Sequence, residues 1–94
     1  MSVCESLVKF VTSALDQGEV LFNGKRVDHI ECQEKRNGGL IDIKLTIETH
    51  TDNNYATFIK DKYTIDAAWR NRCLETDKSF SLTTTSRTVT FTKK

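Results

Sequence analysis

Two histidines and three cysteines are the side chains of this protein best suited to binding a transition metal. Structural zinc sites usually bring ligands close together in the sequence, as in CxxC or HxxxH. The nearest match here is "HIEC", in which His29 and Cys32 lie three residues apart. Residues three apart on a strand point to opposite faces, so this pair would chelate a metal only at a bulge. We therefore predict no metal site and no cofactor.

Cysteine nucleophiles are the next candidates for chemistry. Cys4 lies near the start of a predicted helix and Cys73 follows two arginines, and both settings can lower the pKa of a thiol. A catalytic thiolate also needs a base and an orienting group, and no motif here marks a nucleophile turn or an oxyanion hole. Free cysteines are more often small buried apolar residues. We therefore predict no catalytic cysteine.

Carboxylates and glycine-rich stretches give no further sign of catalysis. Strand alternation places Asp42 and Glu48 on a solvent face, whereas acid–base catalysis needs a desolvated carboxyl group. The stretch "NGG" at 37–39 is a turn and lacks the pattern of a phosphate-binding loop. The sequence therefore predicts a protein without catalytic residues, that is, not an enzyme.

Basic and aromatic residues outline the clearest binding surface. A tryptophan flanked by arginines can stack on bases and contact phosphates. The basic pairs at 25–26 and 35–36 lie at opposite ends of one predicted strand, about 25–30 Å apart, and so do not form one patch. The binding surface predicted from the sequence consists of Trp69, Arg70, Arg72, Lys25 and Arg26.

Charge and cysteine content limit the class of protein. The 14 basic and 13 acidic residues give a net charge of +1, whereas proteins dedicated to nucleic acid or membrane surfaces usually carry a basic excess. Three widely spaced cysteines make a poor disulfide framework, so we expect reduced thiols in a cytoplasmic protein. The start "MSVCESLVKF" lacks the basic region of a signal peptide, and no apolar run has the length of a membrane span. We expect no membrane partner.

The first part of the chain predicts a helix followed by strands. Ser2 and Glu5 form a capping box, an apolar residue then recurs every three or four positions, and Gly18 is a plausible end. Asn23-Gly24 predicts a hairpin in which Phe22 faces Lys25. The following strand changes phase after position 27, which predicts a bulge. After a turn at 36–39, "LIDIKLTIETH" alternates strictly and predicts a strand buried on one face.

The stretch 55–64 fits either a strand or a helix, and we favour a strand from about Tyr55. A short second helix from about Ile65 is then predicted, because an apolar or long side chain recurs at three- and four-residue spacing. The residues on its shared side are Ile65, Ala68, Trp69, Arg72 and Cys73.

The last sixteen residues, "SFSLTTTSRTVTFTKK", predict a hairpin. Phe80 and Leu82 lie at even positions, whereas Val89 and Phe91 lie at odd ones. A turn near 84–87 puts all four on one face, with Phe80 opposite Phe91 and Leu82 opposite Val89. The serines and threonines then form the solvent face of the hairpin.

The sequence thus predicts one domain over 1–94, of α+β class. It has an N-terminal helix packed on a mainly antiparallel sheet, a short second helix and a C-terminal β-hairpin. No family resemblance guides the function. By elimination we expect a small non-catalytic domain that binds another protein, as an adaptor, an inhibitor or an accessory subunit of the kind found in viruses and phages.

Three alternatives stay open. The first is a nucleic-acid-binding protein that uses Trp69, Arg70, Arg72 and the basic hairpin tips. The second is a small-ligand-binding domain or an enzyme with a pocket between helix and sheet. The third concerns assembly, because an exposed C-terminal edge strand would allow pairing into a homodimer.

Overall fold

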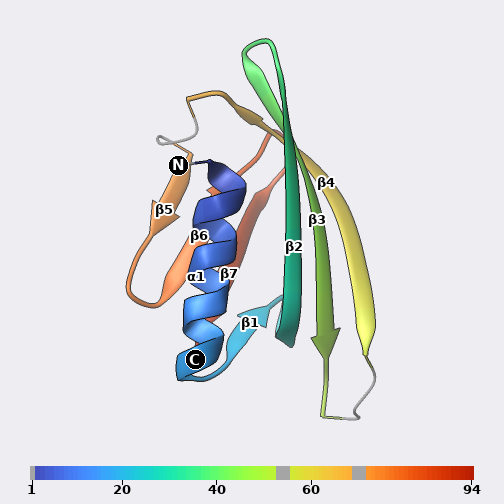
Figure 1. The fold of residues 1–94 in the computed structure, drawn as a ribbon, viewed down its shortest axis with the longest axis vertical. Helices are drawn as coiled ribbons and strands as arrows, with labels where there is room; N and C mark the ends of the chain where they lie inside the picture. The colour runs from blue at the N-terminus through green and yellow to red at the C-terminus, as the bar shows by residue number, and fades with distance from the viewer. Residues whose placement is uncertain (1, 53–55, 69–71) are drawn as a thin grey trace.

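The computed structural model describes residues 2–52, 56–68 and 72–94. In these ranges one helix lies against a seven-stranded sheet (Figure 1). The strand order is β4-β3-β2-β1-β7-β6-β5 with antiparallel neighbours, which confirms the α+β class. Among the described helices none is long and apolar enough to cross a membrane. The elements are α1 (Val3–Gln17), β1 (Val20–Phe22), β2 (Lys25–Asn37), β3 (Leu40–His50), β4 (Thr57–Asp66), β5 (Cys73–Glu75), β6 (Ser79–Thr83) and β7 (Thr88–Lys93).

Helix α1 begins and ends where the sequence predicts. The hydroxyl oxygen of Ser2 accepts a hydrogen bond from the Glu5 backbone N–H at 3.1 Å, which satisfies one donor of the first turn. The Gly18 N–H donates to the Ala14 carbonyl at 3.0 Å and closes the last turn. One face of the helix is buried, and it consists of Val3, Cys4, Leu7, Val11 and Ala14.

The first hairpin and its long second strand also follow the prediction. Asn23 and Gly24 have φ angles of 52° and 78°, the left-handed conformation that these two residue types tolerate best. Phe22 lies opposite Lys25. The register between β2 and β3 shifts between Val27 and His29, which confirms the predicted bulge.

Strand β4 resolves the ambiguity of residues 55–64 in favour of a strand. It begins at Thr57 and runs to Asp66, while the predicted start at Tyr55 lies outside the described residues. Each of its residues from 57 to 66 pairs with β3. Tyr63 is buried opposite Ile43, so alternation against a buried strand determines the conformation.

The predicted short second helix is wrong. Ile65 belongs to β4, where it pairs with Ile41, and Cys73 begins β5. Trp69 lies outside the described residues, and the described neighbours at 67–68 and 72 are not helical. The spacing of Ile65 and Cys73 fitted a helix, but each is instead the inward-facing residue of a different strand.

The C-terminal hairpin has the predicted register. Its cross-strand pairs are Phe80–Phe91, Leu82–Val89, Ser81–Thr90 and Thr83–Thr88. The four apolar residues are buried, whereas the hydroxyl pairs face outward and are half-buried or exposed. However, β7 lies between β1 and β6, so the C-terminal strand is not the edge strand that we expected. The edges of the sheet are β4 and β5.

The sheet curls around α1. Short β1 joins the long strands β2–β4 to the smaller strands β5–β7, and Figure 1 shows α1 lying across the smaller strands beside β2. The Phe10 ring of the helix packs on Phe80 of β6 with centroids 5.8 Å apart. At the far end, the Thr85 N–H of the β6–β7 turn donates to the Thr64 carbonyl of β4 at 2.9 Å. The turn therefore closes back onto the opposite edge strand.

A disulfide joins the first turn of α1 to β2. It links Cys4 and Cys32, which are 28 residues apart in the sequence. The expectation of three reduced thiols is therefore wrong for this pair, whereas Cys73 is free. The Glu34 carboxylate of β2 also accepts the Cys4 backbone N–H at 3.1 Å. A carboxylate at a helix N-terminus is favourable, so a covalent and a polar link fix the same turn.

Reduction of this disulfide is expected to destabilise the protein. A bridge between residues 28 positions apart contributes about 3–4 kcal/mol to the free energy of unfolding in the loop-entropy model. For a chain of this size the loss lowers Tm by roughly 10–30 °C. Thermal unfolding with and without reductant measures it. The Cys73→Ser variant should show the same reductant-dependent shift, and a Tm insensitive to reductant would contradict this role.

Candidate functional site

The residues of the predicted binding surface lie in separate places, as far as the structure describes them. Trp69 and Arg70 lie outside the described residues. Arg72 is exposed just before β5, whereas Lys25 and Arg26 begin β2. Strands β6, β7 and β1 separate β5 from β2. Measured along the curled sheet, four strand spacings of about 4.8 Å, or roughly 19 Å, separate β5 from β2.

Arg26 is occupied by carboxylates. Its guanidinium pairs with Asp52 and lies 3.7 Å from the Glu19 carboxylate. These contacts link β2 to the segments just before β1 and just after β3. A guanidinium paired in this way is less available to a phosphate, and the predicted surface loses part of its positive charge.

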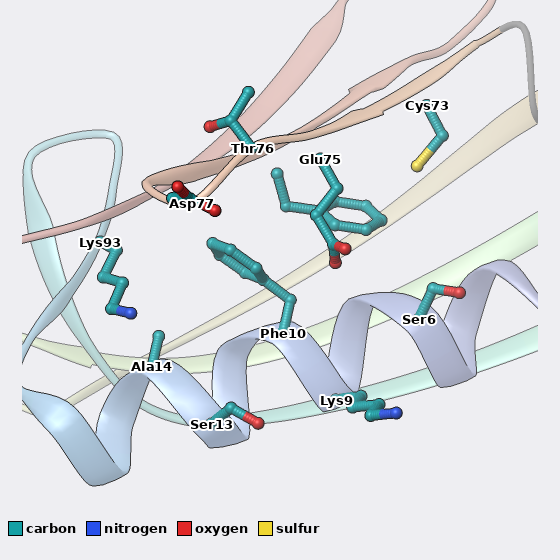
Figure 2. Close-up of a pocket in the computed structure, with 11 residues that line it drawn as sticks. Ser6, Lys9, Phe10, Ser13, Ala14, Cys73, Glu75, Thr76, Asp77 and Lys93 are labelled. Atoms are coloured by element: carbon teal, nitrogen blue, oxygen red, sulfur yellow. The ribbon is translucent and has the colours of Figure 1, made fainter.

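A groove of about 590 Å³ runs between α1 and the β5–β6 hairpin (Figure 2). Its floor is formed by the rings of Phe10 and Phe80, which are tilted by 43° to each other. Charges of both signs and several hydroxyl groups surround this floor. The remaining lining residues are Ser6, Lys9, Ser13, Ala14, Cys73, Glu75, Thr76, Asp77 and Lys93.

Cys73 is the reactive side chain of this groove by type, and Figure 2 shows its sulfur turned toward α1. Burial, with a smaller effect from the negative charge of Glu75, raises the pKa of the Cys73 thiol to about 11. The thiol is therefore protonated at neutral pH and is a poor nucleophile. The described residues that line the groove include no histidine to serve as its base. The groove is a recess with no catalytic arrangement in its described residues.

Arg87, Asp61 and Tyr63 form a cluster that sequence spacing did not reveal. The Tyr63 hydroxyl donates to Asp61 at 2.9 Å, and the Arg87 guanidinium donates to Asp61 at 3.1 Å and to the Tyr63 hydroxyl at 2.8 Å. The guanidinium also lies 5.4 Å from the centre of the Tyr63 ring. Desolvation by burial is the main cause that raises the pKa of Tyr63. Because the three groups bind one another, we interpret the cluster as a latch that holds the β6–β7 turn against β4.

The histidines pair with carboxylates on the outer face of the long strands. His50 Nδ1 lies 2.6 Å from the Asp28 carboxylate, and His29 Nε2 lies 3.5 Å from that of Glu31. Cys32, the predicted companion of His29, is used in the disulfide. Within residues 2–52, 56–68 and 72–94, no three ligand side chains gather as a metal site would require.

The outer edge of β4 has no strand neighbour among the described residues. The Thr64 carbonyl faces away from β3, because it accepts the Thr85 N–H. Backbone groups of alternate residues point the same way, so those of Phe58, Lys60 and Lys62 also face outward. No backbone partner meets them among the described residues. The Phe58 side chain on this strand is 61% exposed.

The opposite edge of the sheet, β5, offers a shorter strand for pairing. β5 has three residues, and one large apolar side chain, Leu74, is 64% exposed on it. Short edge strands are a common protection against unwanted pairing, and β4 with its ten residues lacks that protection. The edge of β4 is therefore the best candidate for a contact surface.

Alkylation of Cys73 tests the description of the groove. With a pKa of about 11 in place of the ordinary 9.0, iodoacetamide at pH 8 should react about 100-fold more slowly than with an exposed thiol, because only the thiolate reacts. Mass spectrometry over time measures the single adduct. The urea-unfolded, disulfide-intact protein is the control and should react at the ordinary rate. A fast reaction of the folded protein would contradict the burial of the thiol.

The raised pKa of Cys73 also makes the free energy of unfolding depend on pH. The folded thiol keeps its proton between pH 9 and about pH 11, where the unfolded thiol loses it. Its contribution to the free energy of unfolding is therefore complete below pH 9 and is lost as the pH rises toward 11. The Cys73→Ser variant should lose this part of the alkaline destabilisation in urea titrations. An identical alkaline profile in both proteins would contradict it.

Comparisons with known proteins do not add to this picture. No protein-family model, curated protein or solved structure matches the chain. Function must therefore be argued from the surfaces themselves. Of those described above, the groove offers mixed polarity and a thiol that burial keeps protonated. The β4 edge offers unpaired backbone groups beside an exposed aromatic ring.

Proposed function

We propose that this chain is a small non-catalytic protein-interaction domain that binds through the free edge of β4. The unpaired outward groups of Phe58, Lys60 and Lys62 carry the proposal. An exposed strand edge is a template on which another strand adds by main-chain hydrogen bonds. The exposed ring of Phe58 supplies apolar contact area at the same place.

The distribution of charge supports a protein partner over a nucleic acid. Arg26, a basic residue of the predicted surface, is held by the carboxylates of Glu19 and Asp52. On the outer face of the long strands, Lys62 of β4 lies opposite Lys44 of β3, whereas the acidic residues of that face are Glu31 on β2 and Asp42 and Glu48 on β3. Phosphate contacts need a concentration of positive charge that this balanced face does not offer.

The disulfide is informative about the cellular compartment in which the protein works. Disulfides persist in oxidising compartments and are rare in the reducing cytosol. The Cys4–Cys32 bridge therefore favours an oxidising compartment over the cytoplasmic location expected from the sequence. Its measured sensitivity to glutathione at cytosolic ratios would test this assignment.

Substitution of Phe58 tests the proposed surface. Phe58→Lys places a charge on the edge, a device by which natural strands block pairing. Glu48 lies opposite position 58 on β3, so the new lysine gains a partner within its own chain and the fold should persist. The tagged protein is incubated with nuclease-treated lysate from its own source and should capture another protein in stoichiometric amount. The Phe58→Lys variant should capture at least tenfold less of that protein.

Leu74→Lys is the matched control, since Leu74 is equally exposed but lies on the other edge. It should capture the same protein as the unmodified chain. If Phe58→Lys and the unmodified chain capture equally, the β4 edge is not the contact surface. If capture is seen in untreated lysate but not after nuclease treatment, the partner is a nucleic acid and the proposal is wrong.

A further inference from the structure

The free part of the β4 edge is bounded at both ends. Strand β4 begins at Thr57. At Thr64 the outer edge is already occupied by the Thr85 N–H of the β6–β7 turn. A strand added to this edge therefore has the stretch from Thr57 to about Lys62 available.

The sequence of this stretch restricts how two copies could pair. Antiparallel pairing across a two-fold axis places one residue opposite itself. If that residue is Lys60, two lysines meet, and if it is Asp61, two carboxylates meet and Lys60 lies opposite Lys62 of the other copy. Like charges directly opposite one another are destabilising. The Asp61 register also brings the second strand against the β6–β7 turn at Thr64.

One register avoids these conflicts and uses most of the stretch. With Ile59 opposite itself, each exposed Phe58 ring faces a lysine of the other copy, which is a favourable cation–π arrangement. Residues 57–61 of both strands are then paired. A register centred on Phe58 would pair only 57–59. Self-complementarity of side chains thus selects the register centred on Ile59.

We propose that the chain forms a two-fold dimer in which β4 pairs with β4 of a second copy, with Ile59 opposite the partner's Ile59 and Phe58 opposite the partner's Lys60. The inference rests on the proposed function and names the partner. The outward backbone groups of Phe58 and Lys60 exchange both hydrogen bonds in this register. Ile59 lies at a non-hydrogen-bonded position, where side chains approach closely, and it is half-buried already.

Cross-linking tests the register. Non-hydrogen-bonded partners have Cα atoms about 4.5 Å apart, which a disulfide can span. In a Cys73→Ser background, Ile59→Cys should therefore form a covalent dimer under mild oxidation at about 100 µM protein, where a small interface is populated. Phe58→Cys is the matched control and should remain uncrosslinked, because the two copies of position 58 lie beyond disulfide reach. Cross-linking of Phe58→Cys alone would overturn the register.

Introducing a repulsive charge pair across the interface and then reversing one of its charges tests the same register without any introduced cysteine. Sedimentation equilibrium should show a dimer whose Kd rises about 30-fold or more in Phe58→Lys, because both symmetric contacts become repulsive. Adding Lys60→Glu should restore Kd to within a few-fold, since each introduced lysine then faces an introduced glutamate of the other copy. In a register centred on residue 58 this rescue would fail, and that result would overturn the proposed pairing.

The outcomes separate this inference from the proposed function. A chain that stays monomeric to about 1 mM, while another protein is still captured in a Phe58-dependent way, overturns self-pairing and leaves the β4 edge as the contact surface. A dimer whose Kd is unchanged in Phe58→Lys also overturns self-pairing through β4. A monomer without Phe58-dependent capture overturns both proposals.

Discussion

The structure depends on burying one apolar stripe of α1 against two parts of a sheet at once. Leu7 and Val11 are fully buried, and burying a side chain of this kind contributes about 1.5–3 kcal/mol. A flat sheet could not cover the stripe from both sides. The three-residue strand β1 links the long strands to the C-terminal hairpin, and at this narrow link the sheet curls, so that Phe10 reaches Phe80 while Cys4 is bonded to Cys32.

Curling the sheet brings its C-terminal turn back to β4, and this contact determines which edge stays open. Arg87 binds Asp61 and Tyr63 on the inner side of β4, and the Thr85 N–H donates a hydrogen bond to the Thr64 carbonyl. The carboxyl-terminal end of β4 is thereby protected. The amino-terminal part has no such cover among the described residues, so the same interaction that closes the fold also limits the free edge to a short stretch.

The outer face differs between the two parts of the sheet. On β2–β4 it carries charges of both signs, including Lys44 beside Lys62 and Asp42 beside Thr64. On β6–β7 it carries hydroxyl groups, with Ser81 and Thr90 oxygens 3.3 Å apart. Threonine suits a pleated surface and adds little apolar area. The threonine-rich terminus is therefore explained by the solvent face of a hairpin, and it needs no ligand.

The sequence by itself determined the elements that depend on neighbours along the chain. The Ser2 cap, the Asn23-Gly24 turn, the alternation of the 40–50 strand and the register of the C-terminal hairpin follow from local backbone preference and the two-residue repeat of a strand. The same local signals failed from Ile65 to Cys73, where helical and strand spacing coincide and pairing with β3 and β6 decides.

Tertiary structure alone decided the features most relevant to function. The bridge from Cys4 to Cys32, the latch made by Arg87 and the inner position of β7 each join segments far apart in the sequence. The free edge of β4 is likewise a consequence of which strands became its neighbours. Local spacing carries no information on such adjacency, because it arises only when α1 and both parts of the sheet bury their apolar faces together.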